Sequence, residues 1–366
     1  MVVKSGFPGE KGKCMRFNIP TCPRVRSHGW VNLNYFLSVL GKILLKKTVW
    51  NKTTRIKIDK IKTKFKYLVF KNKIKSYEVK LRSNTYSIQT FPLPFLSSRE
   101  LFGKPIAYLE QYKNKIVLTS GYGEFFSFEK KDIVSDNINL KKIKSNIKNL
   151  IKNDEFFSHG SMSIRDLLIL DNKIFFSFIK EQTSGCYNTS IMNAEFNLNY
   201  LNFSEFFSYE ECVSSKNIHQ YPPEYGHLNL THIGGRMVSF KNEKIILTTG
   251  DFGYMLLAQD KNSIFGKIIS IDLQSKDYEI ISMGSRNAQG LYYDENRNII
   301  IYTEHGPRGG DEININLKTN NEKIENFGWP ISSYGVHYGG VKTKEAPLHK
   351  SHKDHGFMEP IKYYTP

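Results

Sequence analysis

The sequence predicts an all-β fold of the propeller type. Short apolar runs of strand length recur in pairs, and a polar turn joins the two members of each pair. The pairs return at intervals of roughly 55 to 70 residues. An interval near 50 residues, lengthened by insertions, is typical of propeller blades, each of which is a small antiparallel sheet.

Each pair of runs predicts a β-hairpin, because its turn is built from Lys, Asn, Asp or Glu between two strand-forming segments. The Lys-, Ile- and Asn-rich segment 130–153 is interpreted as the outer strands of a blade or a solvated insertion. In chain order the paired runs are 106–109 with 116–119, 167–170 with 174–178, 236–240 with 245–248, and 290–293 with 299–302.

A β-sandwich would also supply hairpins, so the spacing alone leaves two all-β architectures open. Glycine-rich segments follow the second run of several pairs, at 121–123, 250–253 and 306–310. In a propeller these loops would meet on one face near the central channel, where a shared ligand is expected. The even spacing and the placement of these glycines favour the propeller.

The chain of 366 residues divides by pattern into an atypical leader, 1–60, and a propeller domain, 65–366. The leader shows no strand rhythm. Its segment 31–45 is apolar with basic flanks, but it is short for a membrane span and contains two Asn and a Lys. A membrane anchor, a signal region and an ordinary helix all stay open for this segment.

The net charge of +17 does not by itself indicate a nucleic-acid partner. Most of the excess is lysine spread among Asn and Ile, with no arginine-rich tract or interleaved stacking motif. We therefore predict no nucleic-acid binding, and only a weak, salt-sensitive attraction to anionic surfaces.

Four cysteines occur, and no two have the CxxC spacing of a zinc site. Cys186 and Cys212 flank a polar stretch. A disulfide between them would fit an oxidising compartment, and two buried thiols are the alternative.

The segment 304–314 carries the pattern most typical of a ligand site. It follows an apolar run and crowds three glycines, a proline and several charged residues together. Glycine lets backbone groups approach a ligand closely, and proline fixes the direction of a carbonyl. Carbonyls and carboxylates held in this way, with Gly306 and Pro307 at the centre, suit a hard cation such as calcium.

Three further residues could perform chemistry beside this segment. His232 stands next to paired glycines before a strand, where a neutral imidazole could accept a proton. Asp251 follows the partner strand, so hairpin geometry brings it near His232 as an orienting carboxylate. Arg286 precedes another strand and could neutralise an oxyanion or a carboxylate. The alternatives are that His232 has only a structural role and that Asp251 only forms a turn.

Several enzyme classes lack their motifs in this sequence. There is no GxSxG elbow, no P-loop and no HExxH. No GxGxxG follows a strand, so a nicotinamide cofactor is not expected.

Taken in order, the motifs resemble those of the soluble glucose/sorbosone dehydrogenases, also called aldose sugar dehydrogenases. That family forms six-bladed propellers that use pyrroloquinoline quinone (PQQ) and calcium. The likeness is strong over 225–366, faint over 100–225 and absent before about 65. The matching segments are HIGGR at 232–236, GD at 250–251, GKI at 266–268, RNAQGL at 286–291, the stretch 304–314, and FGWP at 327–330.

The resemblance implies oxidation of an aldose at its anomeric carbon to the lactone. His232 matches the base that takes the proton of the anomeric hydroxyl, and Asp251 matches the residue that orients this base. PQQ would accept the hydride. The implied partner is a small-molecule sugar with an unknown electron acceptor, in the periplasm or outside the cell.

The resemblance also implies the cofactor contacts. Arg286 and Asn287 match residues that contact the quinone, and Gly306 and Pro307 match backbone carbonyls that hold its calcium. The family continues beyond the end of this chain, and the segment 359–366 looks like the start of a further blade. A truncated ring with its last blade material missing is therefore expected.

Two other functions remain open from the sequence. A non-catalytic extracellular propeller could bind a protein or a glycan, although the presence of both His232 and Asp251 argues against it. A calcium-dependent lactonase of the propeller type is the other, and the pair Arg286 and Asn287 is harder to explain there.

Overall fold

The computed structural model describes residues 75–81, 84–90, 107–121, 123–134, 138–151, 164–215, 228–319, 323–338 and 343–366. The predicted leader 1–60, with its segment 31–45, lies outside these residues. Within the described part, no helix is long and apolar enough to cross a membrane.

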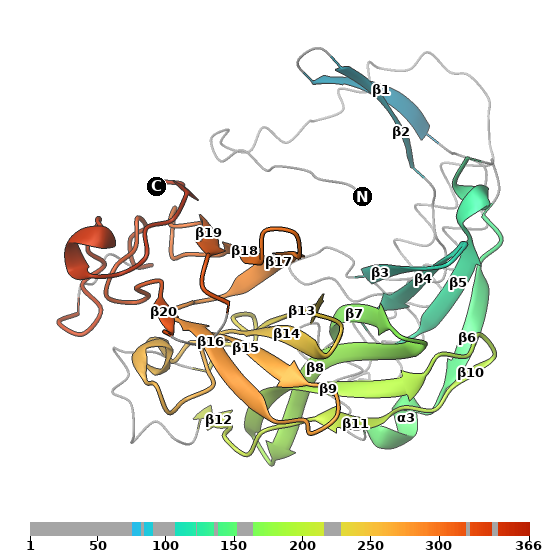
Figure 1. The fold of residues 1–366 in the computed structure, drawn as a ribbon, viewed down its shortest axis with the longest axis horizontal. Coiled ribbons are helices and arrows are strands. Elements are labelled where there is room, and N and C mark those ends of the chain that lie inside the picture. The colour runs from blue at the N-terminus through green and yellow to red at the C-terminus, as the bar shows by residue number, and fades with distance from the viewer. Residues whose placement is uncertain are drawn as a thin grey trace, which may run out of the picture. The chain divides into compact units, whose positions relative to one another are not determined.

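Four sheets follow one another along the chain, and we call them blades 1 to 4 (Figure 1). Blade 1 contains β3 (Ala107–Tyr112), β4 (Lys115–Ser120), β5 (Phe125–Glu129), β6 (Lys141–Ser145) and, parallel to β6, β10 (Tyr200–Leu201). Blade 2 contains β7 (Ile164–Leu170), β8 (Lys173–Thr183), β9 (Cys186–Glu195) and β11 (Ser204–Phe207), and β12 (Val213–Ser214) also pairs with β9.

Blade 3 contains β13 (Gly234–Phe240), β14 (Lys244–Thr249), β15 (Lys267–Asp272), β16 (Tyr278–Met283) and β20 (Glu325–Asn326). Blade 4 contains β17 (Ala288–Asp294), β18 (Ile299–Glu304), β19 (Glu312–Asn316) and β21 (Lys362–Tyr363). A separate antiparallel hairpin is formed by β1 (Lys75–Leu81) and β2 (Asn84–Thr90). The short helices are η1 (Lys130–Val134), α3 (Ile147–Leu150), η4 (Met255–Gln259) and η5 (Lys353–His355).

The first strands of the blades pack against one another in chain order. β3 contacts β7, β7 contacts β13, and β13 contacts β17 (Figure 1). Each blade then runs outward from its first strand. This arrangement is propeller-like, and it confirms the propeller over the sandwich. Four blades are described, so the count of six that the family resemblance implies is not tested by them.

The four predicted hairpins are the first two strands of the four blades, and all are confirmed. Their turns show why the sequence places them there. Asp171 and Asn172 both have positive φ, at 47° and 61°, as do Lys241 and Asn242, at 51° and 57°. Tight hairpin turns of type I′ need two such residues, and Asn and Asp tolerate this conformation better than most side chains. The segment 130–153, for which outer strands or a solvated insertion were left open, supplies η1, β6 and α3, and β6 is an outer strand of blade 1.

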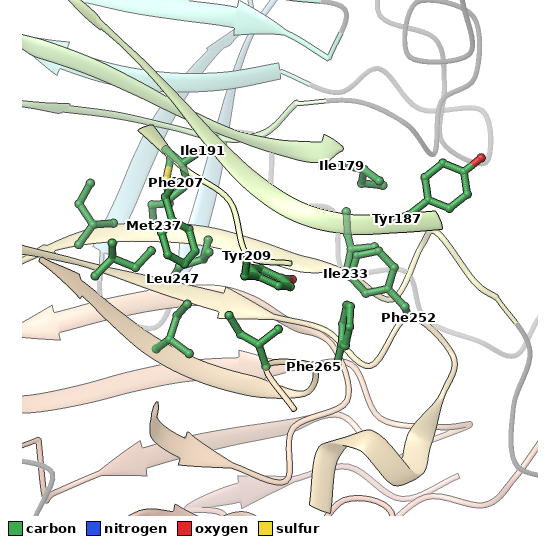
Figure 2. Close-up of a cluster of buried hydrophobic side chains, with 14 of the residues drawn as sticks. Ile179, Tyr187, Ile191, Phe207, Tyr209, Ile233, Met237, Leu247, Phe252 and Phe265 are labelled. Atoms are coloured by element: carbon green, nitrogen blue, oxygen red, sulfur yellow. The ribbon is translucent and has the colours of Figure 1, made fainter. Parts of the chain in front are cut away.

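Apolar side chains fill the spaces between neighbouring blades. The largest cluster lies between blades 2 and 3 (Figure 2), where Tyr209 meets Phe265 edge-on with ring centres 5.9 Å apart. Phe252 is fully buried in this cluster, and its ring centre lies 5.1 Å from that of Phe265. Burying a side chain of this size stabilises the fold by roughly 1.5–3 kcal/mol. Phe252 follows Asp251 directly in the chain. The packing of Phe252 in the core therefore also restrains the backbone of Asp251, the predicted orienting residue.

Cys186 and Cys212 form a disulfide, which settles the alternative that the sequence left open. The bond lies at the start of β9 and beside β12, which returns to pair with β9 through Ser214 and Cys186. The hydroxyl of Tyr254 donates a hydrogen bond to the Ser214 carbonyl at 2.9 Å. The disulfide therefore supports the strand that holds the loop after Asp251.

We predict that replacing Cys186 and Cys212 together with serine lowers the free energy of unfolding by about 3.5 kcal/mol. The disulfide closes a loop with a sequence separation of 26 residues, and its loss restores conformational entropy to the unfolded chain. Urea unfolding of the oxidised protein and the double variant measures the difference. Wild-type protein treated with a thiol reductant should match the variant, and equal stability of all three samples would contradict the prediction.

Candidate active site

His232 and Asp251 meet at one end of the hairpin formed by β13 and β14. His232 precedes β13 and Asp251 follows β14, and their backbones are joined where the Phe252 amide donates to the His232 carbonyl at 2.8 Å. Gly250 makes this approach possible, because a Cβ there would lie 2.1 Å from the His232 carbonyl oxygen. The imidazole Nδ1 lies 3.4 Å from Asp251 Oδ1. Local hairpin geometry thus brings the two side chains together.

The Asp251 carboxylate is almost completely buried, with 1% of its side chain exposed. Its Oδ1 accepts the Gly253 amide at 2.8 Å, and its Oδ2 accepts the indole N–H of Trp329 at 2.9 Å. These bonds offset the cost of burying the charge. The His232 Nδ1 has no aligned hydrogen bond among the described residues, so its contact with Asp251 is close but loose. Such contacts commonly tighten when substrate binds.

The other ring nitrogen of His232 faces two donors. The Arg286 Nη2 lies 2.9 Å from Nε2, and the Asn229 side-chain nitrogen lies 3.2 Å from it. The Asn229 amide is oriented by Thr231, whose backbone N–H and hydroxyl both donate to Asn229 Oδ1. Since both neighbours can only donate, Nε2 acts as the acceptor and the proton belongs on Nδ1, facing Asp251. This tautomer leaves Nε2 as the basic atom.

Arg286 connects the imidazole with the glycine-rich turn after β18. Its Nη1 donates to the His305 carbonyl at 2.9 Å and to the Gly306 carbonyl at 2.8 Å, while Nη2 meets His232. The guanidinium carbon also lies 5.5 Å from the ring centre of Trp329, a distance suited to a cation–π contact. The side chain is 6% exposed, so a full positive charge is fixed beside the candidate base.

Asn287 holds the loop that carries His232. Its Oδ1 accepts the Gly234 amide at 3.1 Å and the Gln289 side-chain amide at 2.8 Å. Its Nδ2 donates to the Thr231 carbonyl at 3.3 Å. The neighbours of His232 on both sides are thus tied to the start of blade 4.

In the turn predicted to hold calcium, the carbonyls of Gly306 and Pro307 each accept one hydrogen bond. The carbonyls of His305 and Gly306 converge on a cationic group, the guanidinium of Arg286, as ligands of a cation would. The Pro307 carbonyl instead accepts the Gly310 amide at 2.9 Å and closes the turn. No group of three or more His, Cys, Asp and Glu side chains suited to a metal occurs among the described residues. Gly306 and Pro307 thus each have one protein donor at the carbonyl and a second lone pair that a cation could use.

Comparison with known proteins identifies the family. The model of the glucose/sorbosone dehydrogenase family matches residues 168–366, more than half of the chain. The chain belongs to the glucose/sorbosone dehydrogenase family. The resemblance drawn from its motifs is therefore confirmed.

Two curated relatives show how much of a family member this chain spans. The chain is 33% identical over 146 residues to aldose sugar dehydrogenase YliI of Escherichia coli, covering 36% of this chain and 37% of that protein. It is 29% identical over 155 residues to quinoprotein glucose dehydrogenase B of Acinetobacter calcoaceticus, covering 34% and 31%. The chain thus spans only about a third of the length of either relative.

Solved structures show the same fold. The apo form of the soluble aldose sugar dehydrogenase of Escherichia coli superposes with a TM-score of 0.52 at 22% identity, over 71% of this chain and 72% of that one. A glucose dehydrogenase crystal structure gives a TM-score of 0.52 at 20% identity, over 70% and 71%. At these identities the likeness supports the fold alone.

The site of this glucose/sorbosone dehydrogenase family member includes polar residues that the sequence did not single out for chemistry. Asn229 donates to the candidate base, and Trp329 donates to the carboxylate beside it. Glu304 accepts the backbone N–H of Arg286. Lys267 is fully buried, and its Nζ donates to the carbonyls of Leu257 and Phe265, both at 2.7 Å, and to Ala258 at 3.2 Å. The motifs of the resemblance contain three of them, and Asn229 carries no motif signal.

Glu304 lies beneath this site in an environment that favours its neutral form. Burial raises its pKa from 4.5 to about 8, with a further increase from Glu312 on the neighbouring strand, and the Arg286 N–H acts in the opposite direction. Glu304 and Glu312 are paired in the register of β18 and β19. Glu304 Oε2 is buried and has no hydrogen-bond partner among the described residues. Ionising both carboxylates in this buried environment would be unfavourable, because the two negative charges would repel each other.

We predict that Glu304 makes the protein less stable as the pH rises from about 5 to 8. The folded state keeps the carboxyl proton where the unfolded chain, with its pKa near 4.5, has lost it. The resulting stabilisation is complete below the unfolded pKa and is lost as the pH rises through about 8. The free energy of unfolding should fall by at most about 1.4 kcal/mol per pH unit.

Urea unfolding at several pH values, on wild type and on Glu304→Gln, measures this effect. The glutamine keeps the shape of the side chain but does not titrate, so the variant should show a flatter pH dependence. Glu195→Gln is the matched control, because its carboxylate is 78% exposed. An identical pH slope in wild type and Glu304→Gln would contradict the prediction.

Proposed function

We propose that this chain is a quinoprotein sugar dehydrogenase, which oxidises an aldose at its anomeric carbon to the lactone with PQQ as hydride acceptor. The observation that carries the proposal is the placement of His232, whose Nδ1 lies 3.4 Å from the buried Asp251 while Nε2 faces the donors of Arg286 and Asn229. Its relatives bear the names aldose sugar dehydrogenase and quinoprotein glucose dehydrogenase, which supports both the substrate class and the quinone.

In this proposal the protein residues move one proton. A substrate hydroxyl replaces one of the two donors at His232 Nε2 and transfers its proton to that atom. Asp251 accepts a hydrogen bond from Nδ1–H, keeps its negative charge and stabilises the imidazolium that forms, as a buried orienting carboxylate does in other enzymes. The Arg286 cation sits beside the reacting atoms and stabilises negative charge there.

The cofactor would occupy the space bordered by these same groups. Arg286 and Asn287 would hold the carboxylates and carbonyls of PQQ, and the carbonyl of Gly306, joined by Pro307, would hold calcium. When bound, PQQ would supply hydride acceptance and calcium would supply Lewis acidity. The carbonyls of Gly306 and Pro307 each accept one hydrogen bond, from Arg286 and from the Gly310 amide, and each keeps a second lone pair for a cation, which supports this assignment.

The wider setting is also part of the proposal. We infer a six-bladed ring to which the four described blades contribute, and a location in the periplasm or outside the cell. The disulfide between Cys186 and Cys212 supports an oxidising compartment. The partner is a small-molecule sugar, nucleic acid is not a partner, and membrane anchoring through 31–45 stays a proposal.

A non-catalytic binding propeller is the second candidate, because His232 Nε2 is already engaged by two donors and the Pro307 carbonyl is used within its turn. Incubating the chain with PQQ and calcium, then following dye reduction with a panel of aldoses, separates the two. Sugar-dependent reduction supports the dehydrogenase. Bound quinone without reduction by any aldose would favour the binding propeller.

We predict that His232→Ala lowers kcat for aldose oxidation by 10²-fold or more, because a positioned base contributes roughly 10²–10⁴-fold. PQQ binding should stay close to wild type, since the quinone contacts are assigned to other residues. Dye reduction gives kcat, and the absorbance of the bound quinone gives its affinity. Equal turnover in wild type and variant would remove His232 from the mechanism.

We predict that Asp251→Asn reduces kcat less than His232→Ala does, and with little change in KM. The amide keeps the shape of the carboxylate, but it cannot stabilise the imidazolium by charge. The same dye assay measures both parameters. A variant with wild-type kcat would show that the carboxylate only supports the turn at 251–253.

A further inference from the structure

The indole of Trp329 lies between the two charged groups on which the proposed reaction depends. Its Nε1 donates to Asp251 Oδ2 at 2.9 Å, and its ring centre lies 5.5 Å from the guanidinium carbon of Arg286. The residue is 5% exposed. One aromatic side chain therefore contacts both the carboxylate behind the base and the cation in front of it.

The backbone around Trp329 makes this indole a rigid donor. The segment continues β20, which pairs with β16, and the Trp329 amide donates to the Gly284 carbonyl at 3.0 Å. The Trp329 carbonyl accepts the side-chain amide of Gln259 at 2.6 Å. The ring also packs in a small apolar cluster with Ala258 and Leu348. Its position is determined by contacts outside the site, so it can impose a direction on Asp251.

We propose that Trp329 is a positioning residue that aims the Asp251 carboxylate at His232 and holds Arg286 beside it. The inference deepens the proposed dehydrogenase function and rests on it. The indole N–H occupies Oδ2, which leaves Oδ1 for the His232 Nδ1 and the Gly253 amide. Without this donor, Oδ2 would compete for the imidazole proton or rotate the carboxylate away from it.

The two contacts of the indole can be separated by substitution. Phenylalanine keeps an aromatic face for Arg286 but has no N–H, whereas leucine removes both contacts. Trp329→Phe therefore tests the aiming of Asp251. Trp329→Leu adds the loss of the cation–π contact and should be the more damaging of the two.

Tyr254→Phe is a matched control in the loop that carries Asp251. It deletes one aromatic donor whose hydrogen bond, to the Ser214 carbonyl, has the same length of 2.9 Å. Tyr254 is also buried, at 2% exposed, and its hydroxyl points away from Asp251 toward β12. A general loosening of the loop would affect this variant and Trp329→Phe alike.

Steady-state dye reduction with PQQ, calcium and an aldose is the first measurement. We expect Trp329→Phe to lower kcat by roughly 10- to 100-fold with KM unchanged, because a misaligned orienting group weakens the base rather than substrate binding. Tyr254→Phe should keep the wild-type kcat. Equal kcat losses in both variants, or none in Trp329→Phe, would overturn the proposal.

NMR of the protein without quinone is the second measurement, and it does not require sugar oxidation. The indole N–H resonance of Trp329, assigned by its loss in Trp329→Phe, should shift in Asp251→Asn and stay in place in Tyr254→Phe. The ¹⁵N shifts of His232 should report Nδ1–H in wild type and a mixture of tautomers in Trp329→Phe.

The NMR result separates failure of the proposed dehydrogenase function from failure of the proposed role of Trp329. If no sugar is oxidised while the indole and His232 resonances respond as expected, the dehydrogenase proposal fails and the positioning by Trp329 stands. An indole resonance that does not respond to Asp251→Asn would overturn the role of Trp329 whatever the enzyme does. This measurement uses the native tryptophan. Where Trp329→Phe does not fold, the resonance is assigned by elimination, because Trp30→Phe and Trp50→Phe each remove one of the other two indole N–H signals.

Discussion

The burial of the Asp251 carboxylate is the constraint on which this end of the molecule depends. A charge at 1% exposure is tolerated only when hydrogen bonds replace its water. The donors come from its own turn through Gly253 and from the outer edge of blade 3 through Trp329. Its backbone amide bonds to the Arg286 carbonyl, at the start of blade 4. Segments far apart in sequence therefore assemble around a single side chain, and His232 receives a fixed neighbour as a result.

The same constraint explains why the site lies over a packed core. Phe252, the residue after Asp251, is fully buried between blades 2 and 3, and Lys267 anchors the following turn through three carbonyls. Burial lowers the Lys267 pKa to about 7, while the charges of Glu211 and Asp260 act in the opposite direction. Apolar packing on one side and charged hydrogen bonds on the other hold the loop with little freedom. In the proposed reaction, a base oriented in this way would need little rearrangement.

Contacts between residues of one hairpin could be predicted from the sequence, and contacts between distant segments could not. The pairing of His232 with Asp251 follows from one hairpin, because the ends of adjacent strands must meet, and the sequence shows that hairpin directly. The bond from Asn229 depends on the orientation of its side-chain amide. The bond from Trp329 depends on the pairing of β20 with β16. Strand periodicity in the sequence predicts neither of these features. The propeller class was predictable as well, because the spacing between successive hairpins is visible along the sequence. The number of blades was not, because it depends on closure of the ring.

Arg286 shows where reasoning from residue types reached only part of the answer. The sequence led us to expect a cation among the candidate residues, and Arg286 lies 2.9 Å from the Nε2 of His232. The structure adds that one guanidinium joins the basic nitrogen of His232 to the Gly306 carbonyl, and that Trp329 lies against its face. Base, orienting carboxylate and turn are thus mechanically linked through two side chains, Arg286 and Trp329. A shift of Arg286 would break its bonds to His232 Nε2 and to the Gly306 carbonyl, and a shift of Trp329 would break its bond to Asp251, so moving either side chain alters the surroundings of His232.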